Sequence, residues 1–187
     1  AGSAGPLRGA KTQLYDGGIR SPLIVWGPKF ISADNRGKSN ESSVFAAFDL
    51  APSLLRITGV PTPPNVRFDG EDLSATLVGR EEQSRAVSLH WRRPPDRKNA
   101  PPALPDPQPD LAVREGKWKL LCDYDGARPE LYDLLGDPAE SKNLAHEHPD
   151  VVQRLKNAAL AWHRSMPPDN GPALGPQSAP QKRPAAK

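Results

Sequence analysis

The first apolar run of the chain is short and uninterrupted. It lies between Pro22 and Gly27 and consists of Leu23, Ile24, Val25 and Trp26. A continuous run of this length is typical of a strand covered on both faces in a parallel or mixed sheet. The sequence therefore predicts an interior strand at residues 23–26. The loop before it carries Lys11, and Gly17-Gly18 allows either positive φ or a close approach to the main chain.

The next apolar pattern has a helical period. Leu50, Leu54 and Ile57 fall on one face of a helix that Gly59 is placed to end. Asp49 precedes this helix, where a short acidic side chain suits the N-cap position. Asp49 could also be considered a metal ligand, but the N-cap role accounts for it without a metal.

Strand-like patterns occupy the second half of the chain. Residues 87–91 predict one strand, and the runs 112–114, 118–124 and 130–134 predict an antiparallel meander with turns at Glu115-Gly116 and Asp125-Gly126. The basic residues of the meander alternate with its apolar ones. We therefore expect them on the solvent-facing side of a half-buried sheet; they are Arg114, Lys117 and Lys119.

A helix is predicted after the meander. Pro149 and Asp150 suit its first turn, and its apolar stripe can cover the meander; the stripe consists of Val151, Val152, Leu155, Ala159 and Trp162. Two segments lack such periods. Residues 92–110 contain seven prolines and predict a long loop, and the composition of residues 167–187 predicts a disordered tail.

Composition excludes several classes of protein. Only 36% of the 187 residues are hydrophobic and 23 are proline, which is little material for a self-sufficient core. The net charge of +3 does not require a nucleic-acid partner. A single cysteine, Cys122, excludes an intrachain disulfide and a CxxC metal site. No apolar run is long enough to span a membrane, and the first residues, which start at Ala1, have no signal-peptide pattern.

Several segments, in order, resemble motifs of the sulfatase family. Lys11 and the following residues 15–22 are similar to its lysine-to-EGG-R-V-P segment, with Asp16 in place of the commoner glutamate and Ser21 in place of valine. Residues 48–59 resemble its DLAPTLL helix. Residues 112–145 resemble its C-terminal signature, which contains WKL, ELYDL and DPAE motifs.

The resemblance implies an α/β fold. The expected architecture is the last part of an alkaline-phosphatase-like sulfatase domain, followed by a small C-terminal antiparallel sheet packed by a helix. In this organisation residues 1–91 belong to the α/β core, 92–110 form the proline-rich loop, 111–166 form the sheet and helix subdomain, and 167–187 form the tail. The chain would then be the C-terminal portion of a longer enzyme that hydrolyses sulfate esters.

The resemblance also implies site residues. Lys11 would stabilise the sulfate oxygens and the leaving group, a role that suits a compact ammonium charge. His90 and Arg92, with Arg93, lie where sulfatases often carry substrate-recognition residues; the alternative is a solvated loop with a partly buried histidine. The formylglycine nucleophile and the Ca²⁺ ligands are expected upstream, because Cys122 lacks the required motif and Asp34-Asn35 suits a turn.

The implied ligand is a sulfated small molecule or a sulfated glycan, with no nucleic acid and no membrane, and the implied compartment is periplasmic, extracellular or lysosomal. Two other classes of function remain open. One is a phosphodiesterase or phosphonate hydrolase of the same superfamily, for which a two-metal ligand set upstream would be decisive. The other is a non-catalytic module that binds sulfated glycans. Alone, the chain is expected to be inactive.

Overall fold

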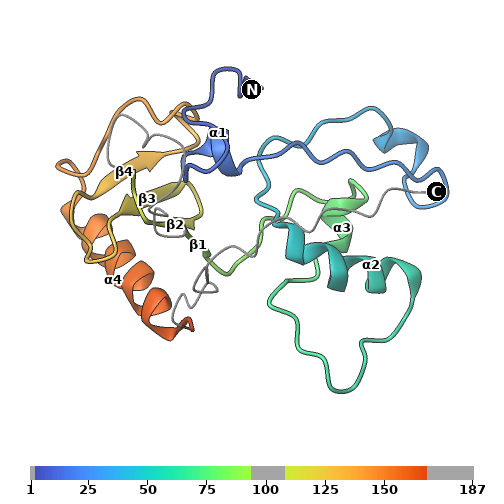
Figure 1. Cartoon of the computed structure of the whole chain (residues 1–187). Helices are drawn as coiled ribbons and strands as arrows, with labels where there is room; N and C mark the ends of the chain where they lie inside the picture. Colours follow the sequence, from blue (N-terminus) through green and yellow to red (C-terminus); the bar gives the residue numbers. More distant parts are fainter. Residues whose placement is uncertain (1–2, 94–107, 168–187) are drawn as a thin grey trace, which may run out of the picture.

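Four antiparallel strands and one long helix organise the C-terminal half of the structure, a computed structural model that describes residues 3–93 and 108–167. The strands are β1 (Leu89–Arg92), β2 (Leu111–Glu115), β3 (Trp118–Cys122) and β4 (Glu130–Asp133), and they form one sheet in the order β1-β2-β3-β4. The helix α4 (Pro149–Ser165) lies along one side of this sheet (Figure 1). None of the helices in the described ranges has the length and apolar character needed to span a bilayer.

The predicted meander is confirmed in type and register. Val113 pairs with Leu120, and Leu120 pairs with Leu131. Gly116 has a φ of 55° in the tight connection between β2 and β3, where a side chain would be strained. The strand predicted at residues 87–91 is also present, and it joins the same sheet because His90 of β1 pairs with Val113.

Both faces of the sheet are covered. On one face, Val152, Leu155 and Ala159 of α4 pack against a buried cluster from the strands, as the apolar stripe predicted; that cluster contains Leu111, Val113, Leu120, Cys122 and Leu131. The opposite face packs against Leu14 and Tyr15, which come from a distant part of the sequence. The side chains of the sheet region in this second buried cluster are Ala112, Leu121, Tyr132 and Leu134. The sheet is therefore an interior layer.

This second layer corrects the prediction for the basic residues of the meander. Lys119 is 0% exposed, whereas Lys117 is exposed and Arg114 is half-buried. The prediction of a solvent-facing position is wrong for Lys119, because residues 8–20 lie over that face of the sheet. Alternation along a strand distinguishes its two faces but does not show what covers each face.

Residues 21–88, which we call the α2 region, contain α2 (Leu50–Thr58) and the short helix α3 (Ser74–Leu77). Gly59 ends α2 in the left-handed conformation with a φ of 70°, as predicted. Asp49 occupies the N-cap position, but its side chain makes no capping hydrogen bond to α2. Instead its carboxylate accepts the N–H groups of Ala46 and Glu71. The N-cap interpretation is therefore right for position and wrong for the contact.

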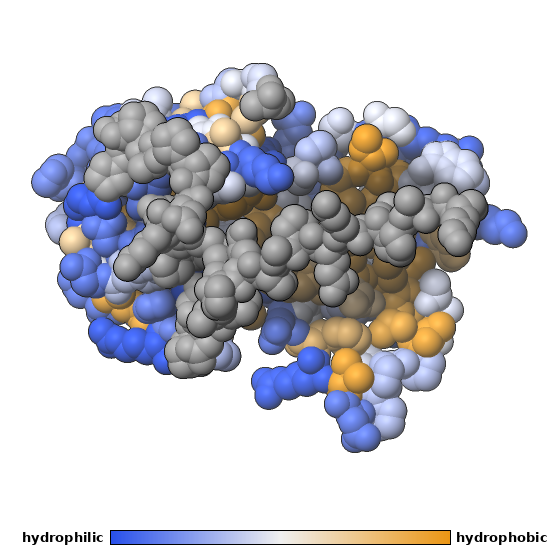
Figure 2. Space-filling model, viewed as in Figure 1, coloured by the Kyte–Doolittle hydropathy of each residue, from blue (hydrophilic) through white to orange (hydrophobic). Residues whose placement is uncertain are grey.

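The interior strand predicted at residues 23–26 is wrong for this structure. The segment has no strand assignment, and Ile24 and Trp26 are 89% and 86% exposed. A strand requires a hydrogen-bonded neighbour, and the four strands of the described ranges pair only with one another. Figure 2 shows further hydrophobic patches on the half of the molecule that contains α2. Most of the predicted proline-rich loop and all but the first residue of the predicted tail lie outside the described residues.

Candidate functional site

Residues 8–20 form a closed segment around Lys11 that contains the one-turn helix α1 (Asp16–Ile19), and we call this segment the Lys11 loop. The N–H of Gly17 donates to the carbonyl oxygen of Arg8 at 2.7 Å, and the N–H of Gln13 donates to that of Ala10 at 3.0 Å. A Cβ atom at Gly17 would lie 2.5 Å from the Arg8 oxygen, and one at Gly18 would lie 2.2 Å from the Gln13 oxygen. The sequence allowed either a positive φ or a close approach to the main chain at Gly17 and Gly18. The structure shows the close approach, since other backbone atoms occupy the space that a side chain would need.

Lys11 lies exposed at the turn of this loop. The next residue, Thr12, has a φ of 83°. This conformation is uncommon for a β-branched residue, and such backbone strain persists only where the surrounding structure imposes it. The loop therefore presents the Lys11 ammonium to solvent from a backbone that is constrained on both sides.

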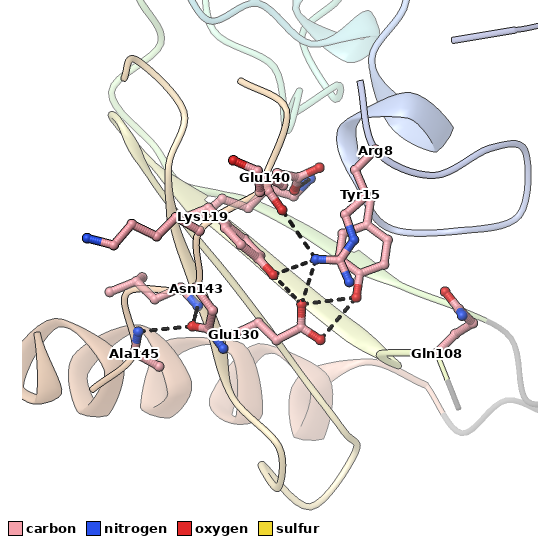
Figure 3. A network of polar contacts seen from close by, with 12 residues as sticks. Arg8, Tyr15, Gln108, Lys119, Glu130, Glu140, Asn143 and Ala145 are labelled. Carbon is pink, nitrogen blue, oxygen red and sulfur yellow. Dashed lines mark hydrogen bonds and ion pairs between the residues drawn. The ribbon is translucent and has the colours of Figure 1, made fainter. Parts of the chain in front are cut away.

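The first anchor of the loop is Arg8 (Figure 3). Its Nη1 donates to the hydroxyl of Tyr132 at 2.6 Å, and its guanidinium lies 3.9 Å from the centre of the Tyr15 ring. The Tyr15 hydroxyl donates to the Glu130 carboxylate at 3.0 Å. Burial, together with the negative charge of Glu130, raises the pKa of Tyr15 and of Tyr132. Both phenols are thus held as neutral donors, and the start of the loop is attached to β4.

The second anchor consists of three buried charged residues, Asp16, Lys119 and Glu140, which we call the buried clamp. Lys119 Nζ lies 2.7 Å from Asp16 Oδ1 and 2.7 Å from Glu140 Oε1. The backbone N–H of Asp16 donates to Glu140 Oε2 at 2.6 Å. Burial raises the pKa of Glu140, and the charge of Lys119 acts against that shift. The end of the loop is therefore attached to β3 and to the segment after β4.

The other two predicted site residues, His90 and Arg92, lie on the opposite face of the sheet. His90 is half-buried and stacks on Trp162 of α4 with ring centres 5.3 Å apart; burial lowers its pKa. Arg92 Nη1 donates to the carbonyl oxygen of Pro167 at 3.3 Å, and Arg93 pairs with Asp110 at 3.2 Å. The structure thus does not bring His90 and Arg92 together with Lys11, and their role in substrate binding stays a prediction.

Metal binding was expected only from residues upstream of this sequence. Within the described ranges, no cluster of three or more His, Cys, Asp or Glu side chains is arranged to hold a metal ion. The buried carboxylates of Asp16 and Glu140 are already engaged by Lys119, so these residues do not fit the Ca²⁺ that the resemblance implies. Asp34 and Asn35 lie in a 3-10 turn (Ala33–Asn35), as interpreted, with Asp34 exposed and Asn35 half-buried. Burial raises the pKa of the Cys122 thiol to about 11, so this cysteine is unreactive at neutral pH.

The comparison with known proteins covers most of the chain. The family model described as the C-terminal region of N-sulphoglucosamine sulphohydrolase matches residues 10–164. The chain belongs to the sulfatase family. Human arylsulfatase A is 31% identical over 185 residues, which cover 85% of this chain and 33% of that protein. The N-acetylgalactosamine-6-O-sulfatase of Bacteroides thetaiotaomicron is 27% identical over 165 residues, or 81% of this chain and 29% of that protein.

A solved structure supports the same assignment for the fold. It comes from work on the metabolism of multiple glycosaminoglycans by Bacteroides thetaiotaomicron, and its TM-score is 0.64 at 25% sequence identity. The match covers 86% of this chain and 32% of the other. This sulfatase chain therefore spans about a third of the length of the relatives that it matches.

The motifs of this sulfatase region meet in space. Asp16 comes from the segment after Lys11, Lys119 from the WKL motif and Glu140 from the DPAE motif. Sequence reasoning matched all three motifs but did not identify Lys119 or Glu140 as partners of the Lys11 loop. The available signal was the charged residue inside each motif, and its partner was too distant in sequence to be recognised from the pattern.

Proposed function

We propose that this chain is the C-terminal portion of a sulfatase that hydrolyses sulfate esters, and that Lys11 is one of its catalytic residues. The observation that carries the proposal is the match of residues 10–164 to a sulfatase C-terminal family, a match that includes Lys11 and its motif. The geometry of the Lys11 loop supports it, since an exposed ammonium on an anchored backbone suits a group that contacts substrate.

The chemistry of sulfate ester hydrolysis requires such a group. As the S–O bond breaks, negative charge develops on the bridging oxygen while the other sulfate oxygens remain anionic. An ammonium held in place can donate to these oxygens and stabilise the transition state more than the ground state. The formylglycine nucleophile and the Ca²⁺ implied by the resemblance would be supplied by the rest of the longer protein.

The substrate that we propose is a sulfated sugar, either free or in a glycan. The relative from Bacteroides thetaiotaomicron is named for a sulfated amino sugar, and the related solved structure comes from work on glycosaminoglycans. Human arylsulfatase A is named for the broader class of aryl sulfates. An aryl sulfate is therefore a suitable first substrate for assays, and sulfated amino sugars are the next to compare.

The exposed apolar side chains support the view that the chain is part of a larger protein. Ile24 and Trp26 are almost fully exposed, and Phe30, Phe48 and Leu54 are each about half exposed. Large apolar surfaces of this kind usually mark contacts with another part of a protein. The relatives are about three times as long as the matched region, which is consistent with such a covering part.

The test is the substitution Lys11→Ala in the full-length protein. We expect kcat/KM on 4-nitrophenyl sulfate to fall by about 10²–10³-fold, the usual loss when a preorganised transition-state donor is removed. Lys11→Arg should restore activity only in part, because a planar guanidinium does not replace a point charge in a close site.

The matched control is Lys142→Ala, which removes another exposed lysine from a loop, one that makes a surface ion pair with Glu147. It should leave both activity and melting temperature unchanged. Lys11→Ala should also leave the melting temperature unchanged, since the side chain is exposed. Turnover within a few-fold of the natural protein in Lys11→Ala would refute the catalytic assignment.

A further inference from the structure

We propose that Lys119 is a positioning residue for Lys11, acting through the carboxylates of Asp16 and Glu140. This inference rests on the proposed function of Lys11. Lys119 lies on the buried side of β3 and is fully inaccessible to solvent, so it cannot touch a substrate directly. Its influence on the reaction must therefore pass through the loop that it holds.

The contacts define how that influence is transmitted. Asp16 is attached twice, by its carboxylate to Lys119 and by its backbone N–H to Glu140. Arg8 is attached at the other end of the loop, to Tyr132 and to the carbonyl oxygen of Glu140 at 3.3 Å. Glu140 therefore contacts both ends of the Lys11 loop, and Lys119 holds the Glu140 carboxylate in place.

The charges make Lys119 necessary for this arrangement. Asp16 and Glu140 are two buried carboxylates, and Lys119 contacts both. Asp16 Oδ2 makes no hydrogen bond within the described part of the chain, and the nearby Arg20 Nη1 is 4.0 Å away. The half-buried Arg114, which pairs with Lys119 across β2 and β3, also carries a charge that acts on both carboxylates. Without the Lys119 ammonium, the two buried carboxylates would lose the cation that contacts both and would keep only this partial compensation, so one must take up a proton or move apart from the other.

Either response would change the position of Lys11. The connection between Asp16 and Lys11 is short. It is kept closed by two hydrogen bonds, from the Gln13 N–H to the Ala10 carbonyl and from the Gly17 N–H to the Arg8 carbonyl. A displacement of Asp16 is thus passed to Lys11 with little relaxation between them. Misplacing a catalytic group by about 1 Å can lower a rate by about 10²-fold.

The experiment combines Lys119→Met with Lys11→Ala in the full-length protein and measures kcat and KM on 4-nitrophenyl sulfate. We expect Lys119→Met alone to lower kcat by about 10-fold to 10²-fold. In the Lys11→Ala background the same substitution should have an effect of less than about threefold, because the positioned group is already absent. This loss of additivity is not expected of a residue that only stabilises the fold.

Two further variants keep the test decisive if Lys119→Met folds poorly. Glu140→Gln keeps an oxygen for the Asp16 N–H and leaves Lys119 paired one-to-one with Asp16, so it should fold, with a smaller kcat loss and the same non-additivity. Lys117→Met is the matched control, since Lys117 lies beside the same strand but is exposed and pairs with Asp133. It should leave kcat unchanged.

A second readout is independent of activity. Hydrogen exchange at the Asp16 amide should accelerate at least tenfold in Lys119→Met, while the amides of β2 stay protected and Lys117→Met shows no change. Equal kcat losses from Lys119→Met with and without Lys11, or unchanged exchange at Asp16, would overturn the positioning role while leaving the proposed function intact. If Lys11→Ala itself were silent, the proposed function would fail, and the positioning role would fail with it.

Discussion

The two regions of this molecule obtain their order from different sources. In the region built from the sheet, α4 and the Lys11 loop, which we call the sheet body, apolar side chains are buried on both faces of the strands. Among the large apolar side chains of the α2 region, only Leu73, Leu77 and Val78 are buried, and half are exposed. Both regions have clear apolar patterns in sequence. The two clusters of buried apolar side chains both belong to the sheet body.

Polar contacts hold the α2 region together instead. The Arg85 guanidinium is 3% exposed and lies 3.4 Å from both the Asp49 and Glu71 carboxylates. The hydroxyl of Ser53 accepts the N–H of Leu73 at 2.9 Å. These contacts connect the start of α2 to the segments on both sides of α3. A few ion pairs and hydrogen bonds therefore connect the segments of this region, in place of an extended apolar interface.

The difference teaches what an apolar pattern can establish. The pattern identifies the side chains that must be buried. It does not identify the segments that pack against them, which come from elsewhere in the chain or from another part of the protein. The sheet body finds its cover within the sequence, in residues 8–20 and in α4. The α2 region does not find it within the described residues, in agreement with the proposal that it contacts the rest of a longer sulfatase.

The largest effect that we expect from breaking one of these regions is that of Arg85→Met. It would leave Asp49 buried without its cation, a change that typically costs about 3–5 kcal/mol. Hydrogen exchange should show loss of protection in α2 while β2 and β3 remain protected. Arg56→Met removes an exposed arginine whose contact with Asp72 is 3.8 Å long, and it should cost about 0.5 kcal/mol or less. Simultaneous unfolding of both regions in Arg85→Met would show that they are not separate.

The next effect concerns the core of the sheet body. Leu120→Ala removes a fully buried side chain from the centre of the sheet and should lower the free energy of unfolding by about 2–5 kcal/mol. Ile24→Ala removes a similar number of carbon atoms from an exposed position. In this variant the free energy of unfolding of the same chain should change by about 0.5 kcal/mol or less. Urea denaturation followed by circular dichroism measures both. A comparable loss in the two variants would mean that residues 23–26 are covered in solution.

Much of the sheet body could be predicted from sequence because its signals are local. Alternation predicted the meander and the helical stripe predicted α4, each from residues near one another in sequence; in the α2 region, Gly59 marked the end of α2 in the same way. The predicted strand at residues 23–26 failed for the opposite reason. A continuous apolar run indicates burial between neighbours, and those neighbours are not among the described residues of this chain.

In the candidate site, too, local features could be predicted from sequence and long-range contacts could not. The position of Lys11 follows from a motif that spans only residues 11–22, so the sequence identified it. Lys119 and Asp16 are separated by 103 positions, and a strand pattern contains no information about which distant loop covers it. The prediction of a solvent-facing Lys119 therefore reversed the actual arrangement, and the clamp could be recognised only once the loop was placed on the sheet.

The smallest effect that we expect is a pH dependence at the junction of β1 and α4. His90 stacks on Trp162, and its Nε2 is buried without a hydrogen-bond partner among the described residues. Burial lowers the folded-state pKa of His90 below its ordinary value of 6.5, and a hydrogen bond with the Ser88 backbone partly opposes the shift. Between these two pKa values the unfolded chain binds more protons than the folded one. Stability therefore falls as the pH drops below about 6.5.

Replacing His90 by Phe isolates this contribution, because the stack on Trp162 can remain while the titration is lost. The difference in melting temperature between the natural chain and His90→Phe should be constant above about pH 7.5 and should shift in favour of the variant on acidification to about pH 5. Glu140, whose raised pKa has the opposite sign, is present in both proteins and cancels in the difference. A constant difference for His90→Phe over the whole range would mean that His90 is solvated rather than packed beneath α4.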